Sequence, residues 1–419
     1  MKSDAIAKTI AVIAALDTKG AEARFIEEII RQRGHHSLVI DIGVLTDPAV
    51  GADISAYEVA HEGGVDLSTL RRNDNKGQAM EAMTRGAAII AAKLYGARRF
   101  DAIVGLGGTA GTAIASSAMR ALPIGLPKVL VSTVGAGDTR PYVGTKDITL
   151  MYSVVDIAGL NCISTRVLGN AAGAVIGMVE TDLPARQNRP LIAASMFGNT
   201  TACVDRARNA LEDAGFEVLV FHATGTGGMT MESLIADGYV NGVLDLTTTE
   251  WADEFCGGVF SAGPGRLDAA ALAGIPQVVA PGCLDMVNFG SPETVPARFA
   301  ARKMYRWNPN VTLMRTDIGE NQELGRLLAT KLNQSTGMTK VVLPLRGVSQ
   351  LDSPGGEFWW PEADQALFQS IRETLRADIS VIEVDANINA PIFADRAAQE
   401  LLRMMEIRRG NCCLPALRT

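Results

Sequence analysis

The segment Asp101–Thr112 runs from a short apolar stretch into a glycine-rich turn and then into small residues that favour a helix. Residues 102–104 are typical of a buried strand, and residues 109–120 are typical of a helix. Gly107 and Gly108 stand between them. A strand that enters a helix through so short a turn is the repeating unit of parallel α/β domains, so this segment points to the α/β fold class.

The same segment predicts an anion site. The first N–H groups of a helix have no partner within it, the helix dipole adds partial positive charge, and glycines let a phosphate approach the backbone. The sequence matches neither the P-loop pattern nor a clean dinucleotide-binding fingerprint. A phosphate site and an ordinary tight turn between a strand and a helix therefore both remain open.

Two further loops of the first half have a similar design. The continuous apolar run Thr9–Leu16 predicts a strand buried on both faces, and Lys128–Ser132 predicts another. Asp17–Gly20 follows the first, and Thr133–Gly137 follows the second. Because the carboxyl ends of parallel strands share one edge, where ligands bind, we expect the loops to converge there. The predicted site comprises Asp17, Thr18, Lys19, Gly20, Gly107, Gly108, Thr109, Gly111, Thr112, Thr133 and Gly135.

Lys19 is the cation of this predicted site. A lysine in such a loop reaches a phosphate as a point charge, and the alternative is an ordinary solvated lysine. We expect Asp17 or Thr18 to cap the helix that follows, and Gly34 to end it.

The region between residues 42 and 76 shows no clear periodicity, and we expect it to be irregular. So long an irregular segment is uncommon unless it is functional. A helix is expected from residue 77 to residue 95, and we assign its apolar face to the core rather than to a cofactor. That face comprises Met80, Met83, Ala87, Ile90 and Leu94.

The polar segment Glu180–Pro190 contains two prolines and predicts an interdomain linker. Strand, loop and helix patterns begin again at residue 191. We therefore expect an α/β protein with two Rossmann-like, doubly wound domains of mainly parallel strands, at residues 1–182 and 190–419. Because loops rich in glycine and threonine end the strands of both halves, we expect a ligand cleft between the domains, with the linker as part of the hinge. The alternative is that the second set contains only turn residues.

The loop after the strand 217–221 resembles the glycine loop of the first half. Gly225, Thr226 and Gly227 are its candidates for phosphate contacts. His222 precedes them and is a candidate acid or base, or a hydrogen-bonded structural histidine.

Two charged residues complete the candidate set. Glu250 opens a helix and is a candidate catalytic carboxylate, a weak candidate ligand of Mg²⁺, or only a favourable charge at the helix dipole. Arg266 follows a turn and is a candidate clamp for an anion, or a surface residue at a helix start.

The net charge of −7, without a long basic run, argues against a nucleic-acid partner. No apolar stretch of roughly 18 residues suggests a membrane span, and the N-terminus lacks a signal-peptide core, so we expect a soluble, cytoplasmic protein. The 6 cysteines form no C-x-x-C pair and have no zinc-ligand spacing, so we expect reduced thiols.

Taken together, several stretches resemble one known family, the UPF0261 proteins, which include Tm-1-like ATP-binding domains. The matching stretches are Ala15–Gly20, Val104–Thr112, Phe221–Gly228, Asp245–Glu250, Ser261–Pro264, Ile275–Val279, Leu284–Gly290, Asn308–Thr316 and Ala390–Ala394. They extend over essentially the whole chain. The sequence departs from the family pattern at Trp307, where that pattern has a histidine, so any role of that histidine is absent.

This resemblance implies two Rossmann-like domains, binding of ATP and a homodimer. Mg²⁺ is a further expectation that rests on Glu250 and a nucleotide's phosphates, not on the resemblance. It supplies no assigned reaction, and the antiviral role of Tm-1 is not carried over. Three functions therefore remain open: an ATP-binding protein with or without an ATP-dependent reaction, an enzyme acting on a phosphorylated or carboxylated metabolite, and a non-catalytic scaffold that a nucleotide stabilises.

Overall fold

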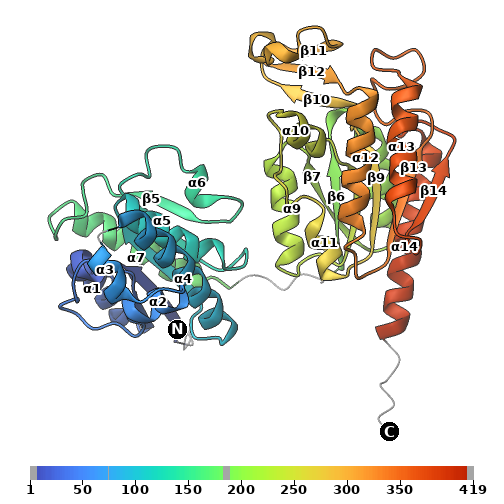
Figure 1. Ribbon diagram of the computed structural model, residues 1–419. Helices are drawn as coiled ribbons and strands as arrows, with labels where there is room; N and C mark the ends of the chain where they lie inside the picture. Colours follow the sequence, from blue (N-terminus) through green and yellow to red (C-terminus); the bar gives the residue numbers. More distant parts are fainter. Residues whose placement is uncertain (1–6, 74, 183–188, 413–419) are drawn as a thin grey trace. The chain divides into compact units, whose positions relative to one another are not determined.

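The computed structural model describes residues 7–73, 75–182 and 189–412 (Figure 1). The chain divides into two compact units, Met1–Ala185 and Arg186–Thr419, which we call unit 1 and unit 2. The central residues of the expected linker, 183–188, lie outside the described ranges. The expected hinge and the expected cleft between the domains stay predictions.

Unit 1 is built on a five-stranded sheet in which every pair of neighbouring strands is parallel, in the order β2-β1-β3-β4-β5. Each strand of the central three is a short apolar run, which suits strands covered on both faces. The strands are β1 (Thr9–Ala14), β2 (His36–Asp41), β3 (Ala102–Gly107), β4 (Lys128–Ser132) and β5 (Thr149–Tyr152).

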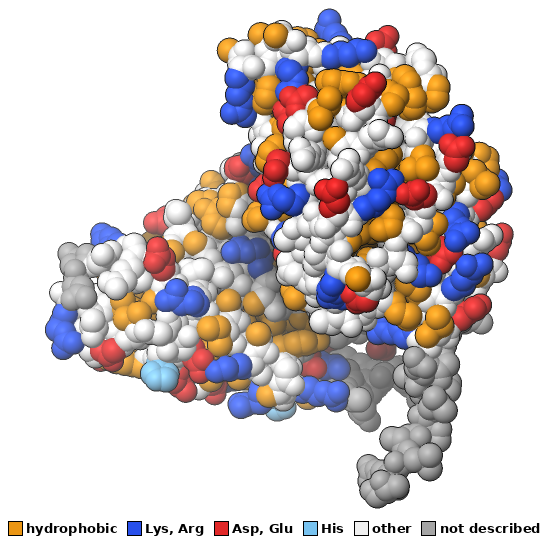
Figure 2. Space-filling model, turned by 45° about the vertical axis from the view of Figure 1, so that its right-hand side comes forward, with side chains coloured by type: hydrophobic (Ala, Val, Ile, Leu, Met, Phe, Trp, Pro, Cys, Tyr) orange, Lys and Arg blue, Asp and Glu red, His pale blue; other side chains and the backbone are white. Residues whose placement is uncertain are grey.

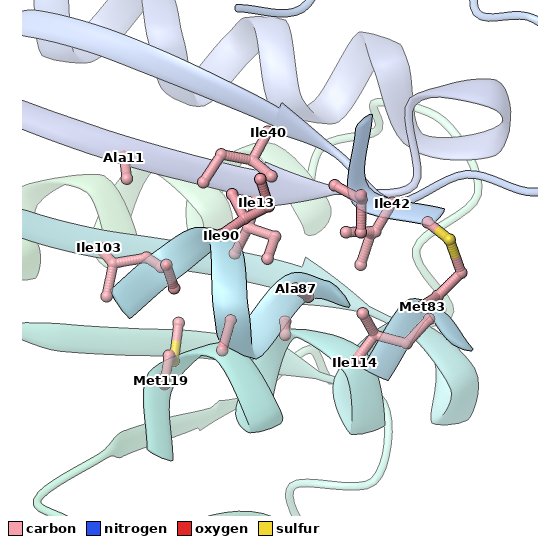
Figure 3. Close-up of a cluster of buried hydrophobic side chains, with 14 of the residues drawn as sticks. Ala11, Ile13, Ile40, Ile42, Met83, Ala87, Ile90, Ile103, Ile114 and Met119 are labelled. Atoms are coloured by element: carbon pink, nitrogen blue, oxygen red, sulfur yellow. The ribbon is translucent and has the colours of Figure 1, made fainter. Parts of the chain in front are cut away.

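Helices cover both faces of this sheet. They are α1 (Leu16–Gln32), α2 (Ala56–Glu62), α3 (Leu67–Asn73), α4 (Lys76–Gly96), α5 (Thr109–Arg120), α6 (Arg140–Val143) and α7 (Ser164–Glu180). Alternate strand residues face opposite sides. Ala11 and Ile13 pack with α2–α5, whereas Ile10 and Val12 pack with α1 and α7. Figure 3 shows the first of these cores, to which α4 contributes Met83, Ala87 and Ile90, so the core assignment of that face is confirmed.

Two expectations for the first half are wrong. The segment after β2 is not irregular throughout, because it contains α2 and α3. Ser55 and Glu58 form a capping box at the start of α2, a signal that is present in the sequence. Neither Asp17 nor Thr18 caps α1, since both lie inside its first turn and its N-cap residue is Ala15.

Unit 2 contains a six-stranded parallel sheet in the order β14-β13-β9-β8-β6-β7. Its strands are β6 (Leu191–Met196), β7 (Glu217–His222), β8 (Gly242–Thr247), β9 (Gln277–Gly282), β13 (Thr339–Pro344) and β14 (Ser380–Val384). Numbered within each parallel sheet, the strand orders are 2-1-3-4-5 and 2-1-3-4-5-6. Both units therefore have the flavodoxin-like variant of the doubly wound sheet, whose order reverses between its first and third strands.

The helices of unit 2 also form two layers. They are α8 (Thr201–Asp213), α9 (Thr226–Ala236), α10 (Glu250–Cys256), α11 (Asp268–Ala273), α12 (Ile318–Leu332), α13 (Pro361–Thr374) and α14 (Pro391–Cys412), with short 3-10 helices at Gly198–Thr200, Pro292–Thr294 and Ala297–Phe299. The helices α8 and α14 pack on one face of the sheet, and the others pack on the opposite face.

A small antiparallel sheet interrupts unit 2 between β9 and α12. It has the order β10-β12-β11, from β10 (Met286–Phe289), β11 (Met304–Asn308) and β12 (Val311–Arg315). It lies at one end of the six-stranded sheet (Figure 1). The contact of β11 with residues that follow β6 and β7 shows that this is the carboxyl end of those strands.

The predicted fold class, two Rossmann-like α/β domains with mainly parallel sheets, is confirmed. Acidic and basic side chains are intermixed over the visible faces of both units (Figure 2), in keeping with short-range surface ion pairs such as Arg206–Asp395. Within the described ranges, no helix is both long enough and apolar enough to cross a membrane.

Candidate functional site

The carboxyl edge of the unit 1 sheet gathers the predicted loops. Strand β3 pairs with both β1 and β4, so the loops that follow these three strands leave the same edge side by side. The order of the sheet reverses between β1 and β3, which is where open α/β sheets bind ligands. Two broad hollows of about 620 Å³ in unit 1 lie elsewhere, one beside α2 and α4 and one at the amino ends of the strands. The sheet edge is the candidate site, because no side chain of the described residues caps the first N–H groups of α5 there.

The amino end of α5 is open. Its N-cap residue is Gly108, and no side chain caps the helix. A Cβ atom built on Gly108 would find only Thr133 Oγ1 nearby, at 3.9 Å. The N–H groups of the first helical turn, from Thr109 to Gly111, therefore face space that protein atoms do not fill, and the helix dipole favours negative charge there.

Other predicted residues of this loop form contacts within the loop itself. A Cβ atom on Gly107 would lie 2.7 Å from Gly111 Cα, so only glycine allows this turn. The buried Thr112 hydroxyl bonds Gly107 O at 3.1 Å and Ser132 Oγ at 2.7 Å. A Cβ atom on Gly135 would lie 2.6 Å from a side-chain carbon of β5. Gly107, Thr112 and Gly135 therefore hold the loop in shape rather than face a ligand.

The loop after β1 contributes one cation. Lys19 has non-helical backbone angles, φ −128° and ψ 20°, which kink the first turn of α1. Its ammonium forms no ion pair with the described part of the chain. Asp17 Oδ2 accepts a hydrogen bond from Leu45 N at 2.8 Å, and Gly20 packs against Val50. Of the four predicted residues, Lys19 is the one whose charged group remains available.

The amino end of α1 already holds a carboxylate. Asp41, at the end of β2, accepts hydrogen bonds from Leu16 N at 2.9 Å and from Gly43 N at 2.8 Å. Burial raises the pKa of Asp41, and these two N–H groups oppose that rise. An external anion therefore has less to gain at α1 than at α5.

In unit 2 the second glycine loop is filled by the protein itself. Glu250 Oε1 accepts hydrogen bonds from Gly225 N at 2.8 Å and from Gly228 N at 3.0 Å. A Cβ atom on Gly228 would lie 2.2 Å from Glu250 Oε2, and one on Gly227 would lie 1.9 Å from His222 O. These glycines are required by the close approach of the loop to its own residues.

Arg266 completes this internal site. It is 1% exposed and binds Asp245 through two bonds, from Nη1 to Oδ2 at 2.5 Å and from Nη2 to Oδ1 at 2.7 Å. Its Nε donates to Glu250 Oε2 at 2.7 Å, and its Nη1 lies 3.2 Å from Glu232 Oε1. Burial by itself lowers the pKa of Arg266, but the three carboxylates raise it well above its ordinary value.

These contacts change the interpretation of four candidates. Gly225, Gly227, Glu250 and Arg266 are engaged with one another or with their own loop, so a phosphate or a metal ion would have to displace internal bonds. We therefore leave them out of the proposed ligand site. Among the second-half candidates, His222 and Thr226 remain exposed to solvent.

His222 lies in a small pocket rather than beside Glu250. The pocket has a volume of about 190 Å³ and is lined by His222, aromatic rings and the small sheet. No hydrogen bond from the described part of the chain holds the imidazole. The structural role that we considered for this histidine therefore has no bond to support it.

A second buried cluster lies near the carboxyl ends of β9 and β13. Arg315 Nη2 lies 2.7 Å from Asp364 Oδ1 and 3.6 Å from Asp352 Oδ1, and Ser349 Oγ donates to Asp285 Oδ2 at 2.8 Å. Burial, together with the charge of Asp352, raises the pKa of Asp285 to about 7 and that of Asp364 to about 8. One guanidinium thus faces three buried carboxyl groups.

Asp253 is a further buried carboxyl group in unit 2. It accepts hydrogen bonds from Asn288 N at 2.6 Å and from Asn288 Nδ2 at 2.8 Å. Burial raises its pKa to about 8.

We expect these groups to make unit 2 less stable as the pH rises. Their folded-state pKa values lie above the ordinary value near 3.9, so their contribution is fully present below that value and is lost as the pH rises through the folded values of about 7 to 8. Asp253→Asn should remove one such ionisable carboxyl group. The variant should keep the local hydrogen bond, because the amide oxygen of asparagine still accepts from Asn288 N. Urea titrations should give the free energy of unfolding of both proteins. The value for the wild type minus that for the variant should fall by about 1.4 kcal/mol per pH unit between pH 5 and 7. A difference that is independent of pH would contradict a raised pKa for Asp253.

Sequence reasoning missed the partners in these clusters. Asp245 stands alone among apolar residues of β8, and Arg315 ends the apolar strand β12. A charged residue in a buried strand needs a partner. Asp245 and Arg315 were therefore the signals in the sequence that pointed to buried ion pairs. The partners themselves are 16 to 64 residues distant in sequence, which local patterns do not reveal.

Both halves of the chain match family models. Residues 8–184 match the N-terminal domain, and residues 189–405 the C-terminal domain, of the uncharacterised protein family UPF0261. A UPF0261 protein of Clostridium tetani is 51% identical over 401 residues, which cover 95% of this chain and 99% of that protein. A UPF0261 protein of Mesorhizobium japonicum is 44% identical over 397 residues, which cover 93% of this chain and 98% of that protein.

A plant protein is also similar. The ToMV susceptible protein tm-1(GCR26) of Solanum lycopersicum is 38% identical over 421 residues, which cover 94% of this chain and 55% of that protein. The chain thus spans about half the length of the tomato protein. Among solved structures, the match to Acinetobacter baumannii MurG covers 95% of this chain and 100% of that chain, at 13% identity and with a TM-score of 0.21.

Proposed function

The chain belongs to the UPF0261 family, and on that premise we propose that unit 1 binds ATP, with the phosphates at the amino end of α5. The proposed contacts are the N–H groups of Thr109, Ala110 and Gly111, together with the ammonium of Lys19. Gly108 lets the phosphates approach the backbone. The homodimer that the family resemblance implies belongs to the same proposal.

The observation that carries the proposal is the contrast between two glycine loops. At α9, the N–H groups of Gly225 and Gly228 already hold an anion, the buried carboxylate of Glu250. At α5, a loop of similar design has no side-chain cap and has open space at Gly108. Because unpaired N–H groups and the helix dipole favour an anion, the open loop suits an external phosphate.

We propose Mg²⁺ only as an ion that binds together with the triphosphate. Proteins usually bind Mg²⁺ through one or two carboxylates and the substrate phosphates. Glu250, the weak candidate from the sequence, uses both carboxylate oxygens in other bonds. No cluster of three or more His, Cys, Asp or Glu side chains with the geometry to hold a metal ion occurs in the described ranges.

The direct test compares ATP with ligands that lack one of its parts. Calorimetry and thermal unfolding should be measured with ATP, adenosine, tripolyphosphate and small phosphorylated acids. At 100 times its Kd, ATP should add about 2.7 kcal/mol of stability. Stronger binding of a phosphorylated acid would favour the metabolite enzyme, and a lack of binding by every phosphate would rule out the proposal.

Lys19→Ala should weaken ATP binding and leave adenosine binding unchanged, because the proposed contact is to phosphate alone. A charge-assisted bond is worth about 1.5–3 kcal/mol, which corresponds to roughly a 10- to 150-fold rise in the Kd of ATP. The matched control is Lys93→Ala on α4, where the lysine pairs with Glu62. Equal losses for ATP and adenosine would make Lys19 a structural residue.

A further inference from the structure

The aromatic pocket of unit 2 is distinct from the proposed nucleotide loop of unit 1. It lies where residues that follow β6 and β7 meet the small sheet, and its volume is about 190 Å³. The residues that define it are Phe197, His222, Phe260, Trp307, Asn308 and Leu313. The small sheet therefore provides a wall for the carboxyl edge of the main sheet, the edge at which doubly wound domains bind ligands.

Aromatic rings form most of the wall. The ring of Phe197 lies 5.4 Å from that of His222 and 6.2 Å from that of Phe260, measured between centroids. Trp307 also lines the pocket and reaches the residue after Phe197, since a Cβ atom on Gly198 would lie 3.7 Å from Trp307 Cζ2. Trp307 is 44% exposed, so a large part of its side chain is open to a ligand. A flat ligand could cover it.

The polar groups of the pocket are neutral or weakly basic. Asn308 Oδ1 accepts from Asn310 N at 2.8 Å, so the amide nitrogen of Asn308 remains available to donate. The imidazole of His222 adds a second polar edge. Among the described residues, the lining contains no Asp, Glu, Lys or Arg.

We propose that this pocket binds a single neutral, planar heteroaromatic ring of nucleobase size that carries hydrogen-bond acceptors on its edge. The volume equals that of about six water molecules, below the roughly 300 Å³ at which pockets for whole drug-sized ligands begin. Stacking on aromatic side chains tolerates any flat ring, and the amide of Asn308 selects rings with an acceptor. A quaternary ammonium ion fits less well, because none of the described residues that line the pocket is a carboxylate.

The test uses adenine as the probe and the full chain as the protein. Trp307→Ala should raise the Kd of adenine about 5- to 150-fold in calorimetry, as expected for the loss of one stacking partner. Asn308→Asp keeps the acceptor for Asn310 N and removes the donor, and should raise the Kd about 3- to 10-fold. Phe255→Ala removes a comparably exposed ring, 45% exposed on α10 outside the pocket, and should change nothing.

The outcomes separate this proposal from the nucleotide site. A loss of adenine binding in Gly108→Val but not in Trp307→Ala would place the base in unit 1 and overturn the proposal. Unchanged binding in Trp307→Ala, or binding of tetramethylammonium in place of adenine, would also overturn it. If Trp307→Ala does not fold, Trp307→Leu keeps the apolar bulk without the ring, and the same loss is expected. Failure of ATP to bind unit 1 would leave the expected adenine result unchanged.

Discussion

Gly108→Val should abolish ATP binding and leave unit 1 folded. The substitution adds two methyl groups in front of the N–H groups of α5, where the proposed phosphates lie. The fold should tolerate it, because a Cβ atom at this position meets only Thr133 Oγ1, at 3.9 Å. The backbone angles, φ −72° and ψ −166°, also suit a β-branched residue. We expect the Kd of ATP to rise more than about 100-fold, since two or more charge-assisted bonds of about 1.5–3 kcal/mol each would be lost.

A matched control separates the loss of ATP binding from any general effect of replacing a glycine by valine. Gly169 in α7 also has no atom within 4 Å of its missing Cβ, and Gly169→Val should leave ATP binding unchanged. Gly107→Val should instead disrupt the loop, because its Cβ would lie 2.7 Å from Gly111 Cα. Calorimetry with ATP and circular dichroism on the three variants would check these results. Unchanged ATP affinity in a folded Gly108→Val variant would remove this loop from the proposed site.

The sequence predicted the fold class well for a physical reason. Strands buried on both faces of a parallel sheet are short, continuous apolar runs, such as residues 9–14 and 102–104. The small antiparallel sheet was harder to predict from the sequence. Its strand β12 is apolar, but β11 is largely exposed, and the two pair in an antiparallel way across a short turn. Alternation of βα units therefore did not predict a separate sheet there.

The candidate site shows a sharper limit of sequence reasoning. The loops at Gly107–Thr112 and at Gly225–Gly228 look alike in sequence, and both were predicted to hold phosphate. They differ because Glu250, 22 residues after Gly228, fills one of them. Composition and spacing identify a loop that is able to hold an anion. They do not reveal whether a distant carboxylate of the same chain already occupies it.

Arg266→Met should be the most destabilising of the changes considered for unit 2. Methionine has a similar length and no charge, so the carboxylates of Asp245, Glu250 and Glu232 would lose their common partner. Asp245 and Glu250 are each 1% exposed. Removal of one partner from a buried ion pair costs about 3–5 kcal/mol, because an uncompensated charge remains. For a unit of this size, the melting temperature should fall by roughly 10 °C.

The pH dependence identifies the cause of that loss. Without Arg266, Asp245 and Glu250 would carry buried negative charge that no guanidinium compensates, and protonation removes such a charge. The penalty should therefore be smaller in acid and should grow as the pH rises toward 7. A double variant, Arg266→Met with Glu250→Gln, should be more stable at pH 7 than Arg266→Met alone. The amide oxygen of a glutamine still accepts from Gly225 N and Gly228 N, and one buried negative charge is gone.

The surface pair Arg206–Asp395 provides the control for this prediction. It also has two bonds between one guanidinium and one carboxylate, from Nε to Oδ1 at 2.7 Å and from Nη2 to Oδ2 at 2.8 Å, but both side chains are exposed to solvent. Arg206→Met should hardly change the melting temperature, since water screens the remaining carboxylate. If Arg266→Met and Arg206→Met have the same melting temperature at pH 7, the carboxylates around Arg266 do not need its charge to remain buried in the folded protein. Glu250 would then be available for a ligand or a metal ion, as its position at the start of a helix first indicated.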